Sequence, residues 1–526
     1  MACRMRMTRR SAVLIAAAVA TVSLASAIPS GASGSGSSVL AFARDEVAYY
    51  QQQVPPEVAA NCLAPAGRPT PGSAAWRRRD AVNQYCATLR LRDQIDSPAY
   101  LAANVLQGNA LYLAQLRQQL GEPGHIHGGI TTLIPGALNA DPFRTLARWT
   151  QAGRGRVAPV KFRSLDGAQL RGYVFAPPTS LTPPAGGYPG IVITDGSIQA
   201  YQQLYFWAAE GLAEAGYMVM TYDPQGQGDS DLLPTKCQPS AAELRSGSLC
   251  TGVPYQQNYN FFQGAEDSLN FFLSTPTKPY GGSHNPWYAL LNAGNVGIAG
   301  HSLGAAGVTE VGQCDTRVKT VVAWDNLGQA TFPCQGSVTV PAAFQSTALH
   351  APALALTNDY GFNPQPMSSA PDPHARDAGY RQLTAAGLDS MTIAFRGATH
   401  LTYSYIPYLL PASELAERMA FYYTLAWFDR YLRGDPSGFT RLVAHQYDAS
   451  ADAHSIGAGI YSATAAKADP TDPYAGNVPY RIAGIPIANS VSFYYQSEYT
   501  LTPPSGGVAT CTDVRAGCPA VAPPTP

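Results

Sequence analysis

A serine flanked by glycines is the group in this sequence best suited to nucleophilic chemistry. Residues 300–304 read Gly-His-Ser-Leu-Gly, and three small residues follow them. The preceding residues 295–299 read Asn-Val-Gly-Ile-Ala, which is typical of a short buried strand. The G-x-S-x-G pattern between a strand and a helix holds its serine on a sharp turn that leaves no room for neighbouring side chains. The pattern therefore predicts an exposed Ser302 hydroxyl. The alternative is a turn whose serine only caps the helix.

A serine hydroxyl is a weak nucleophile at neutral pH, so it needs a base to take its proton and an acid to orient that base. His400 follows the apolar run 391–395 and a short turn of mostly small residues. Two earlier apolar runs are followed by acids, because Asp325 comes directly after residues 318–324 and Asn358-Asp359 comes after residues 352–357. A serine, an acid and a histidine thus come in this order at the ends of predicted strands.

The segment around Ser302 resembles the nucleophile elbow of the α/β-hydrolase fold, and the resemblance extends from near Val157 to Arg433. The resemblance implies a Ser-acid-His triad in that chain order, with His400 as the base. It places the acid after the second of the two candidate strands, which favours Asp359 and leaves Asp325 as the alternative. His301, between the glycine and the serine, is interpreted as a packing residue.

Two further segments carry the resemblance. Residues 189–197 read as a strand and a turn, with Asp195 where the family usually has histidine. Residues 223–230 read Asp-Pro-Gln-Gly-Gln-Gly-Asp-Ser, with Gln225 where the family usually has arginine. The resemblance implies that the backbone N–H groups of Ser197 and Leu303 form the oxyanion hole.

The expected activity is hydrolysis of carboxylic esters by a secreted serine hydrolase through an acyl-enzyme intermediate. Its expected substrate is a small-molecule, lipid or polymeric ester, and no metal or other cofactor is expected. One alternative is a secreted peptidase or amidase of the same fold. Another is a non-catalytic binding protein on a hydrolase scaffold, since a fold alone does not decide function.

The elements that must position these residues alternate between short β-branched runs and helical patterns from Val157 to about Arg433. This alternation predicts an α/β fold with a mostly parallel central sheet flanked by helices. The expected divisions are a helical N-terminal region over 39–153, a catalytic domain over 154–435 and a C-terminal extension over 436–526. Within the extension, residues 490–495 read as a strand.

The first residues point to export. Residues 1–10 hold four arginines and no acid, residues 11–24 are mostly apolar, and Ala25-Ser26-Ala27 follows. These are the three parts of a secretory signal peptide over 1–27, and an uncleaved membrane anchor is the alternative. A Gly/Ser-rich linker is expected over 28–38. No later segment is apolar enough to cross a membrane, so no stable membrane insertion is expected after signal cleavage.

The cysteine count agrees with an extracellular protein. Of nine cysteines, Cys3 belongs to the expected signal, and the other eight fall in close couples. An even number in an exported chain indicates disulfides, and pairing between neighbours is one of 105 possible connectivities. The candidate couples are Cys62 and Cys86, Cys237 and Cys250, Cys314 and Cys334, and Cys511 and Cys518. A metal site at His125 and His127 is discounted because no third ligand lies nearby in the sequence.

The charge balance excludes one class of partner. The chain has 526 residues, with 34 basic side chains against 35 acidic ones and a formal net charge of −1. It contains no basic run of the kind that binds phosphate backbones, so no nucleic-acid partner is expected.

Overall fold

The protein is described from a computed structural model. It covers residues 69–95, 110, 113–122, 124–125, 127, 146–197, 201–232, 258–325, 327–334, 338–404, 414–452 and 482–520. The expected signal peptide (1–27), the linker (28–38) and the cysteines Cys62, Cys237 and Cys250 lie outside the described residues.

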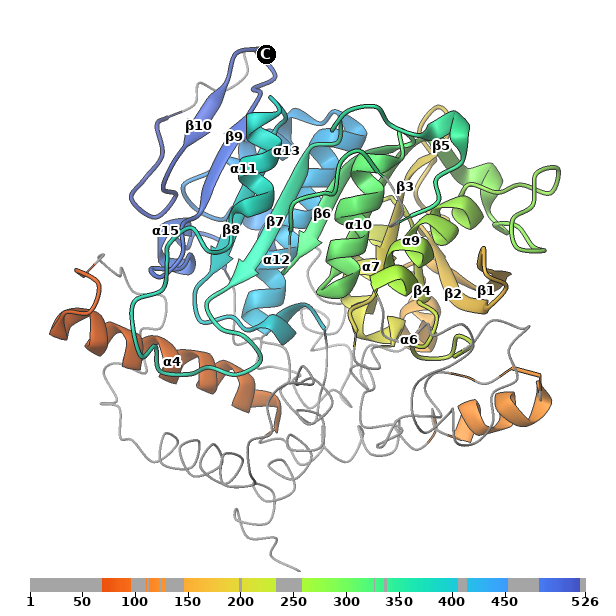
Figure 1. Ribbon diagram of the computed structural model, residues 1–526, viewed down its shortest axis with the longest axis horizontal. Coiled ribbons are helices and arrows are strands. Elements are labelled where there is room, and N and C mark those ends of the chain that lie inside the picture. Colours follow the sequence, from red (N-terminus) through yellow and green to blue (C-terminus); the bar gives the residue numbers. More distant parts are fainter. Residues whose placement is uncertain are drawn as a thin grey trace, which may run out of the picture.

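A ten-stranded sheet runs through the centre of the molecule (Figure 1). Its spatial order is β1-β2-β4-β3-β5-β6-β7-β8-β9-β10. The six strands from β4 to β8 are parallel, whereas β1, β2, β9 and β10 pair antiparallel at the two edges. The strands are β1 Arg156–Arg163, β2 Gln169–Ala176, β3 Tyr188–Thr194, β4 Met218–Asp223, β5 Leu291–His301, β6 Val318–Trp324, β7 Ala353–Asn358, β8 Ser390–Phe395, β9 Glu498–Leu501 and β10 Ala509–Cys511.

Helices cover both faces of this sheet, so the central strands are buried on both sides. Successive strand residues enter different cores: Ile191 and Ile193 of β3 belong to one apolar cluster and Val192 to the other. This explains why the parallel strands are continuous apolar runs instead of alternating ones. The first cluster includes α6 Leu146–Gln151, α7 Phe206–Glu214, α12 Glu414–Phe428 and α13 Pro436–Leu442. The second includes α9 Asn258–Phe272, α10 Leu303–Cys314 and α11 Ala378–Ala385. The expectation of a mixed α/β fold with a large central sheet flanked by helices is confirmed.

The sheet reverses its winding direction beside β3. The chain passes from β3 outward to β4 and then returns to β5 on the other side of β3. The crevice beyond the carboxyl ends of such neighbouring parallel strands is where open α/β sheets bind ligands. Ser302 follows β5 directly, and Asp195, Gly196 and Ser197 follow β3. The topology therefore brings the predicted serine and the predicted oxyanion loop to the same crevice.

Helix α4, Ala74–Ile95, lies within the expected helical N-terminal region and packs near the carboxyl ends of β7 and β8. Trp76 and Ala87 join an apolar cluster with Tyr360 and Phe493. At the centre of this contact, the Asn83 side-chain amide donates to Asp359 Oδ2 over 2.7 Å. The described part of the N-terminal region is thus tied to the sheet.

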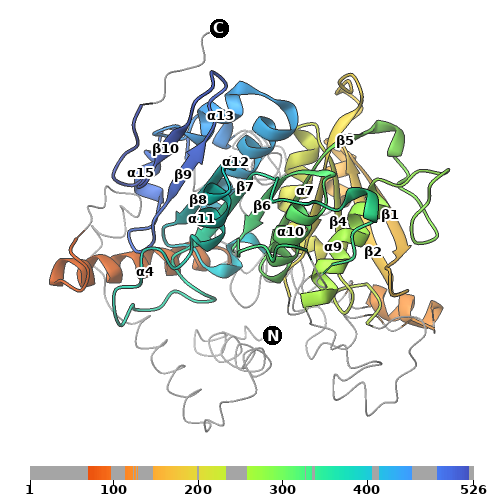
Figure 2. The ribbon, with the colours of Figure 1, turned by 45° about the horizontal axis from the view of Figure 1, so that its top comes forward.

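The C-terminal residues continue the sheet, and Figure 2 shows β9 and β10 beyond β8 at its edge. The expected strand over 490–495 is wrong, because the strand that pairs with β8 is β9, Glu498–Leu501. Phe493 and Tyr494 instead pack their rings against Trp76 of α4. Tyr494 donates to Asp80, and Phe493, Tyr494 and Tyr495 are buried.

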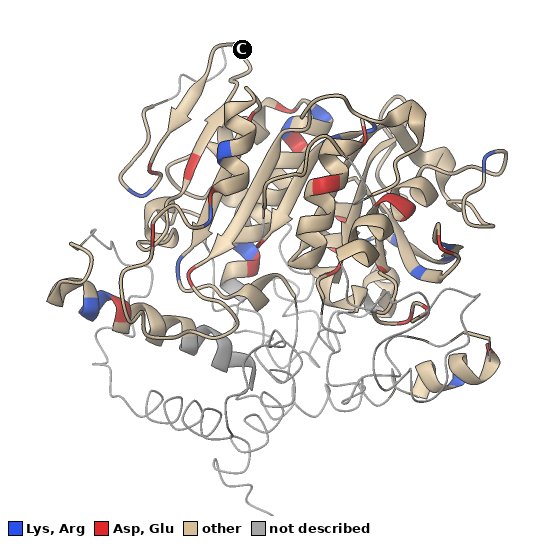
Figure 3. Ribbon diagram, in the orientation of Figure 1, with Lys and Arg blue, Asp and Glu red and all other residues tan. Residues whose placement is uncertain are grey.

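Two of the expected cysteine couples are disulfides, Cys314–Cys334 and Cys511–Cys518. Over the described ranges, no helix combines the length and the apolar character needed to cross a bilayer. The two disulfides are compatible with a secreted protein. Acidic and basic positions are interspersed over the elements (Figure 3).

Candidate active site

Ser302 stands on a strained turn between β5 and α10. Its backbone has φ 56° and ψ −119°, a positive φ that non-glycine residues rarely adopt. Its N–H donates to the Trp324 carbonyl over 3.0 Å, which attaches the turn to the end of β6. Such strain persists only where surrounding structure enforces it, and it concentrates at functional sites.

The glycines around Ser302 are required by close backbone contacts. A Cβ atom on Gly300 would lie 2.5 Å from the Gly304 carbonyl oxygen. A Cβ atom on Gly304 would lie 2.1 Å from the Asp195 carbonyl oxygen. Since both contacts are with backbone atoms, no side-chain rotation could relieve them. The two glycines therefore let α10 begin directly against the end of β3.

We expect Gly304→Ala to lower the free energy of unfolding by about 1–3 kcal/mol, because α10 must move away from β3 to admit the methyl group. Denaturant unfolding measures this change. Gly294→Ala is the matched control, since Gly294 lies in the same β5 and its added Cβ would have no contact shorter than 3.5 Å. Equal stability of both variants and the native protein would contradict this account of the turn.

Three side chains from different strand ends form a hydrogen-bonded series. His400 Nε2 lies 2.9 Å from Ser302 Oγ. On the other side of the ring, His400 Nδ1 contacts Asp325 Oδ2. Since a carboxylate only accepts, Nδ1 carries the proton and Nε2 offers its lone pair to the Ser302 hydroxyl. The arrangement can take a proton from Ser302 and stabilise the imidazolium that results.

The residue on His400 is Asp325 and not the favoured Asp359. Asp325 directly follows β6 and has φ 52°, which turns the chain sharply at that point. Asp359 directly follows β7 and is fully buried elsewhere. Its Oδ2 accepts from the Asn83 amide and from the Gly397 N–H, each over 2.7 Å. Asp359 therefore anchors α4 and the turn before His400, and the preference for it as the partner of His400 is corrected.

Asp325 is kept ionised although it is buried. Burial opposes its charge, but the His400 hydrogen bond, the charge of His400 and the nearby Arg376 together outweigh it and lower the pKa of Asp325. Arg376 Nη1 lies 3.3 Å from Asp325 Oδ1, and its guanidinium stacks over Tyr495 at 4.5 Å. Arg376 cannot be identified from the sequence, since no local pattern places residue 376 beside residue 325.

His400 is held by its backbone and by an aromatic neighbour. Its N–H donates to the Gly361 carbonyl over 2.7 Å. The Phe362 ring packs edge-on against the imidazole, with 5.1 Å between ring centroids, and Phe362 is 43% exposed. Phe362 therefore gives the solvent side of His400 an apolar neighbour, and no local sequence pattern indicates this contact.

The end of β3 lies directly against Ser302. A Cβ atom on Gly196 would lie 3.2 Å from Ser302 Cβ, so Ser197 follows at the edge of the site. Leu303 is the first residue of α10, where backbone N–H groups have no intrahelical acceptor. The two residues expected to form the oxyanion hole thus come from segments that flank Ser302.

Two buried acids, Asp195 at the end of β3 and Asp223 at the end of β4, form a pair next to the expected oxyanion loop. Asp195 is fully buried, and burial together with the charge of Asp223 raises its pKa well above the ordinary value. Burial also raises the pKa of Asp223 to about 7, with the charge of Asp229 adding to it. Asp223 accepts from the backbone N–H groups of Gln202 and Asp229 over 2.8 and 2.9 Å. These donors favour the charge on Asp223, so the proton of the pair resides on Asp195.

We expect this pair to make the protein less stable as the pH rises. The folded pKa values lie above the ordinary 3.8, so the folded state retains protons that the unfolded chain has lost. The free energy of unfolding therefore falls between about pH 4 and pH 7. In Asp195→Asn the amide donates to Asp223 without ionising. The difference in unfolding free energy between pH 5 and pH 8 should shrink by on the order of 2 kcal/mol.

Denaturant unfolding at the two pH values tests this expectation, with the exposed Asp166→Asn as the control. An unchanged pH dependence in Asp195→Asn would show that the pair does not share a proton.

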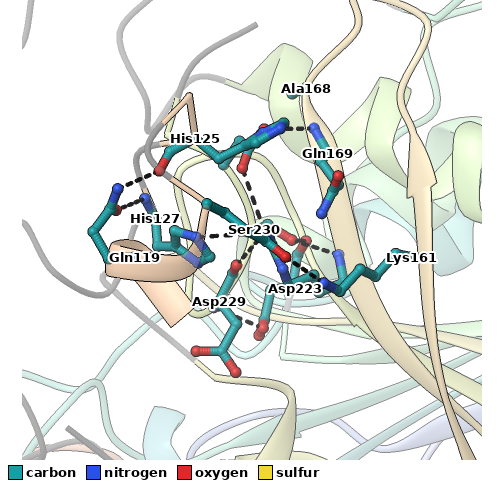
Figure 4. A network of polar contacts seen from close by, with 12 residues as sticks. Gln119, His125, His127, Lys161, Ala168, Gln169, Asp223, Asp229 and Ser230 are labelled. Carbon is teal, nitrogen blue, oxygen red and sulfur yellow. Dashed lines mark hydrogen bonds and ion pairs between the residues drawn. The ribbon is translucent and has the colours of Figure 1, made fainter. Parts of the chain in front are cut away.

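A polar network joins the described residues between 115 and 127 to the loop that follows β4 (Figure 4). Gln115 donates to Asp229 over 2.8 Å, and His125 Nδ1 lies 2.5 Å from Asp231 Oδ2. Glu122 contacts Lys161 over 2.5 Å and also Arg171. The network anchors the described N-terminal residues to β1, β2 and the loop after β4.

Neither histidine of that network belongs to a group of three possible metal ligands among the described residues. His125 Nδ1 contacts Asp231, and burial, followed by the charge of Arg171, lowers the pKa of His127 to about 4, so the His127 ring is neutral at pH 7. Elsewhere in the described ranges, one group brings three possible ligand atoms within 4.8 Å of one another: His374, Asp377 and Glu498. Asp377 in that group already pairs with His374 over 2.6 Å and with Arg381 over 2.8 Å. Ion pairing therefore accounts for its contacts.

Comparison with known proteins gives one distant similarity. No family model matches the chain. Among curated proteins, the chain is similar to one named Thiohydrolase apmlB from Arthrinium phaeospermum, with 30% identity over 164 residues. The alignment spans 31% of this chain and 41% of the relative, so less than half of that relative is matched.

Proposed function

We propose that the protein is a serine hydrolase of the α/β-hydrolase fold that cleaves carboxylic esters through an acyl-enzyme intermediate. The observation that carries the proposal is the hydrogen-bonded series Ser302–His400–Asp325 on a strained strand-to-helix turn. The chain order serine, acid, histidine is that of the fold family to which the sequence has its resemblance. The similarity to a protein named thiohydrolase supports the hydrolase part.

Acylation begins when Ser302 Oγ attacks the substrate carbonyl carbon and its proton passes to His400 Nε2. The carbonyl π electrons move to oxygen, and the N–H groups of Ser197 and Leu303 stabilise that oxyanion. When the intermediate collapses, the bond to the alcohol oxygen breaks. The departing oxygen takes the proton from His400, and the acyl group remains on Ser302.

Deacylation repeats these steps with water. His400 takes a proton from water as the water oxygen attacks the acyl carbon. The second tetrahedral intermediate collapses by breaking the bond to Ser302 Oγ, which recovers its proton from His400. Asp325 stabilises the imidazolium in both halves and stays ionised throughout.

A thioester is the second candidate substrate, and the name of the similar protein favours it. The chemistry is the same except that a thiolate leaves. A thiol has a pKa near 8.5, so its departure depends less on proton donation by His400 than the departure of an alcohol does.

The test compares three substrates with one acyl group: a butyrate ester, a butyryl thioester and a butyryl anilide. Turnover of the ester or thioester that disappears in Ser302→Ala supports the proposal, and the preferred leaving group identifies the class. Turnover of the anilide alone would reassign the protein to amide hydrolysis. Absence of turnover and of any covalent reaction with a fluorophosphonate would indicate a binding protein.

We also propose that the protein is exported. The support is the signal-like sequence over 1–27 together with the disulfides Cys314–Cys334 and Cys511–Cys518. N-terminal sequencing of the protein from the culture medium should begin at Ile28. Retention in cells with Met1 intact would contradict export.

A further inference from the structure

His301, interpreted from the sequence as a packing residue, makes two hydrogen bonds on opposite sides of its ring. Nε2 lies 2.8 Å from the His400 carbonyl oxygen. Nδ1 lies 2.9 Å from Tyr205 Oη. The side chain is 3% exposed and immediately precedes Ser302 in the chain. It therefore contacts the backbone of the histidine whose side chain serves as the proposed base.

The direction of each hydrogen bond follows from its partner. A carbonyl oxygen can only accept, so His301 Nε2 carries a proton and donates it to His400. In the neutral ring, Nδ1 then carries no proton and accepts a hydrogen bond from the Tyr205 hydroxyl. The Tyr205 oxygen in turn accepts from the Gly196 N–H over 2.8 Å. The series runs from the Gly196 amide through Tyr205 and His301 to the His400 carbonyl.

Burial keeps this histidine neutral. Removal from water is the largest effect and the charge of His400 adds to it, and together they lower the pKa of His301 to about 3. The titratable groups that face it are His400, Asp325, Tyr205 and Tyr403, and the rings of His301 and His400 have centroids 4.7 Å apart. A second positive charge so close to the proposed imidazolium would oppose proton transfer, and a neutral ring avoids that cost.

The series of hydrogen bonds connects two segments that must be held in fixed positions around Ser302, the turn at His400 and the loop at Gly196. One end holds the turn of His400, which supplies the proposed base. The other holds the Gly196 amide, directly before Ser197, and a Cβ on Gly196 would lie 3.0 Å from His301 Nδ1. Since its N–H is used by Tyr205, Gly196 is not an oxyanion donor, which leaves that role to Ser197.

We propose that His301, with Tyr205, is a positioning residue that fixes the His400 turn and the oxyanion loop relative to Ser302. This inference rests on the proposed serine-hydrolase function. The proposed role of His301 differs from packing, because it requires a hydrogen-bond donor on one side of the side chain and an acceptor on the other. Glutamine can supply both groups, whereas leucine supplies neither and phenylalanine at 205 removes the hydroxyl.

The experiment measures kcat and KM per titrated active site for the native protein, H301L, H301Q, Y205F and the double variant H301L/Y205F. We expect H301L and Y205F to lose about 10- to 100-fold in kcat with little change in KM, because misplacement affects the transition state most. H301Q should recover most of the loss. The kcat of the double variant should be no lower than that of the worse single variant, because either substitution already interrupts the same series of hydrogen bonds.

His350→Leu is the matched control. His350 Nε2 also lies near a backbone carbonyl, that of Val318 at 3.2 Å, but outside the site. It should change stability without changing kcat. The inference is overturned if H301L keeps native kcat, if H301Q is as impaired as H301L, or if the two losses multiply.

S302A separates this inference from the proposed function. If S302A retains native turnover, the proposed function fails. The inference is then judged by nitrogen NMR of S302A, with H301Q assigning the signals. We expect His301 to show a protonated Nε2 and an unprotonated Nδ1 at every pH from 5 to 9. A titration of His301 in that range, or the opposite tautomer, would overturn it.

Discussion

Ser302→Ala should reduce ester turnover by at least about 10⁴-fold while leaving the fold unchanged. The hydroxyl oxygen is the atom that forms the covalent bond, and among the described residues no other hydroxyl lies within hydrogen-bond distance of His400 Nε2. Removing it also relieves no packing strain that would alter the sheet, because Ser302 is partly exposed at the end of β5. Steady-state hydrolysis of a butyrate ester measures the loss.

The control for this variant is its stability. Thermal unfolding of Ser302→Ala should match that of the native protein within a few degrees. Native-like turnover in a folded Ser302→Ala would contradict the proposed role of the serine.

Asp325→Asn should lower kcat by about 10³- to 10⁴-fold, because asparagine can hold His400 in the wrong tautomer and cannot balance the imidazolium. The same substitution at the neighbouring strand end, Asp359→Asn, should leave kcat within about threefold. The donors Asn83 and Gly397 bond to one oxygen of Asp359, which the asparagine carbonyl can replace. The two variants, Asp325→Asn and Asp359→Asn, are therefore a matched comparison of two buried acids at adjacent strand ends.

Active-site titration alongside the kinetics distinguishes a smaller amount of folded protein from a lower kcat per active site. A large loss in Asp359→Asn with native-like Asp325→Asn would reverse the assignment and restore the expectation from the resemblance.

The difference between these two acids shows where the sequence stops being informative. Asp325 and Asp359 both follow strands that end at the same edge of the sheet, so strand patterns cannot separate them. The choice depends on contacts distant in the chain. Asn83 engages Asp359 from 276 positions away, and the positive φ of Asp325 directs the chain after β6. Neither feature has a local pattern.

The strand-to-helix turn was easier to predict, because its requirements are local. The close contacts of Gly300 and Gly304 with backbone demand glycine, and this leaves a pattern within five residues. The mainly parallel sheet was also predictable, since strands buried on both faces are continuous apolar runs.

The C-terminal strand was harder to predict. Residues 490–495 have strand-like composition, but Phe493 and Tyr494 pack against Trp76 of α4, and this long-range packing overrides local propensity. The partners of His301 are not predictable from the sequence either, because Tyr205 and the His400 carbonyl come from other segments.

The most direct test of the central claim is the identity of the covalently modified residue. The native protein is incubated with a fluorophosphonate, and the modified peptide is sequenced by mass spectrometry. The account predicts one phosphonyl group per chain, on Ser302, with labelling that is strongly slowed in His400→Ala. Labelling of a different residue, or labelling of Ser302 at an equal rate without His400, would contradict it.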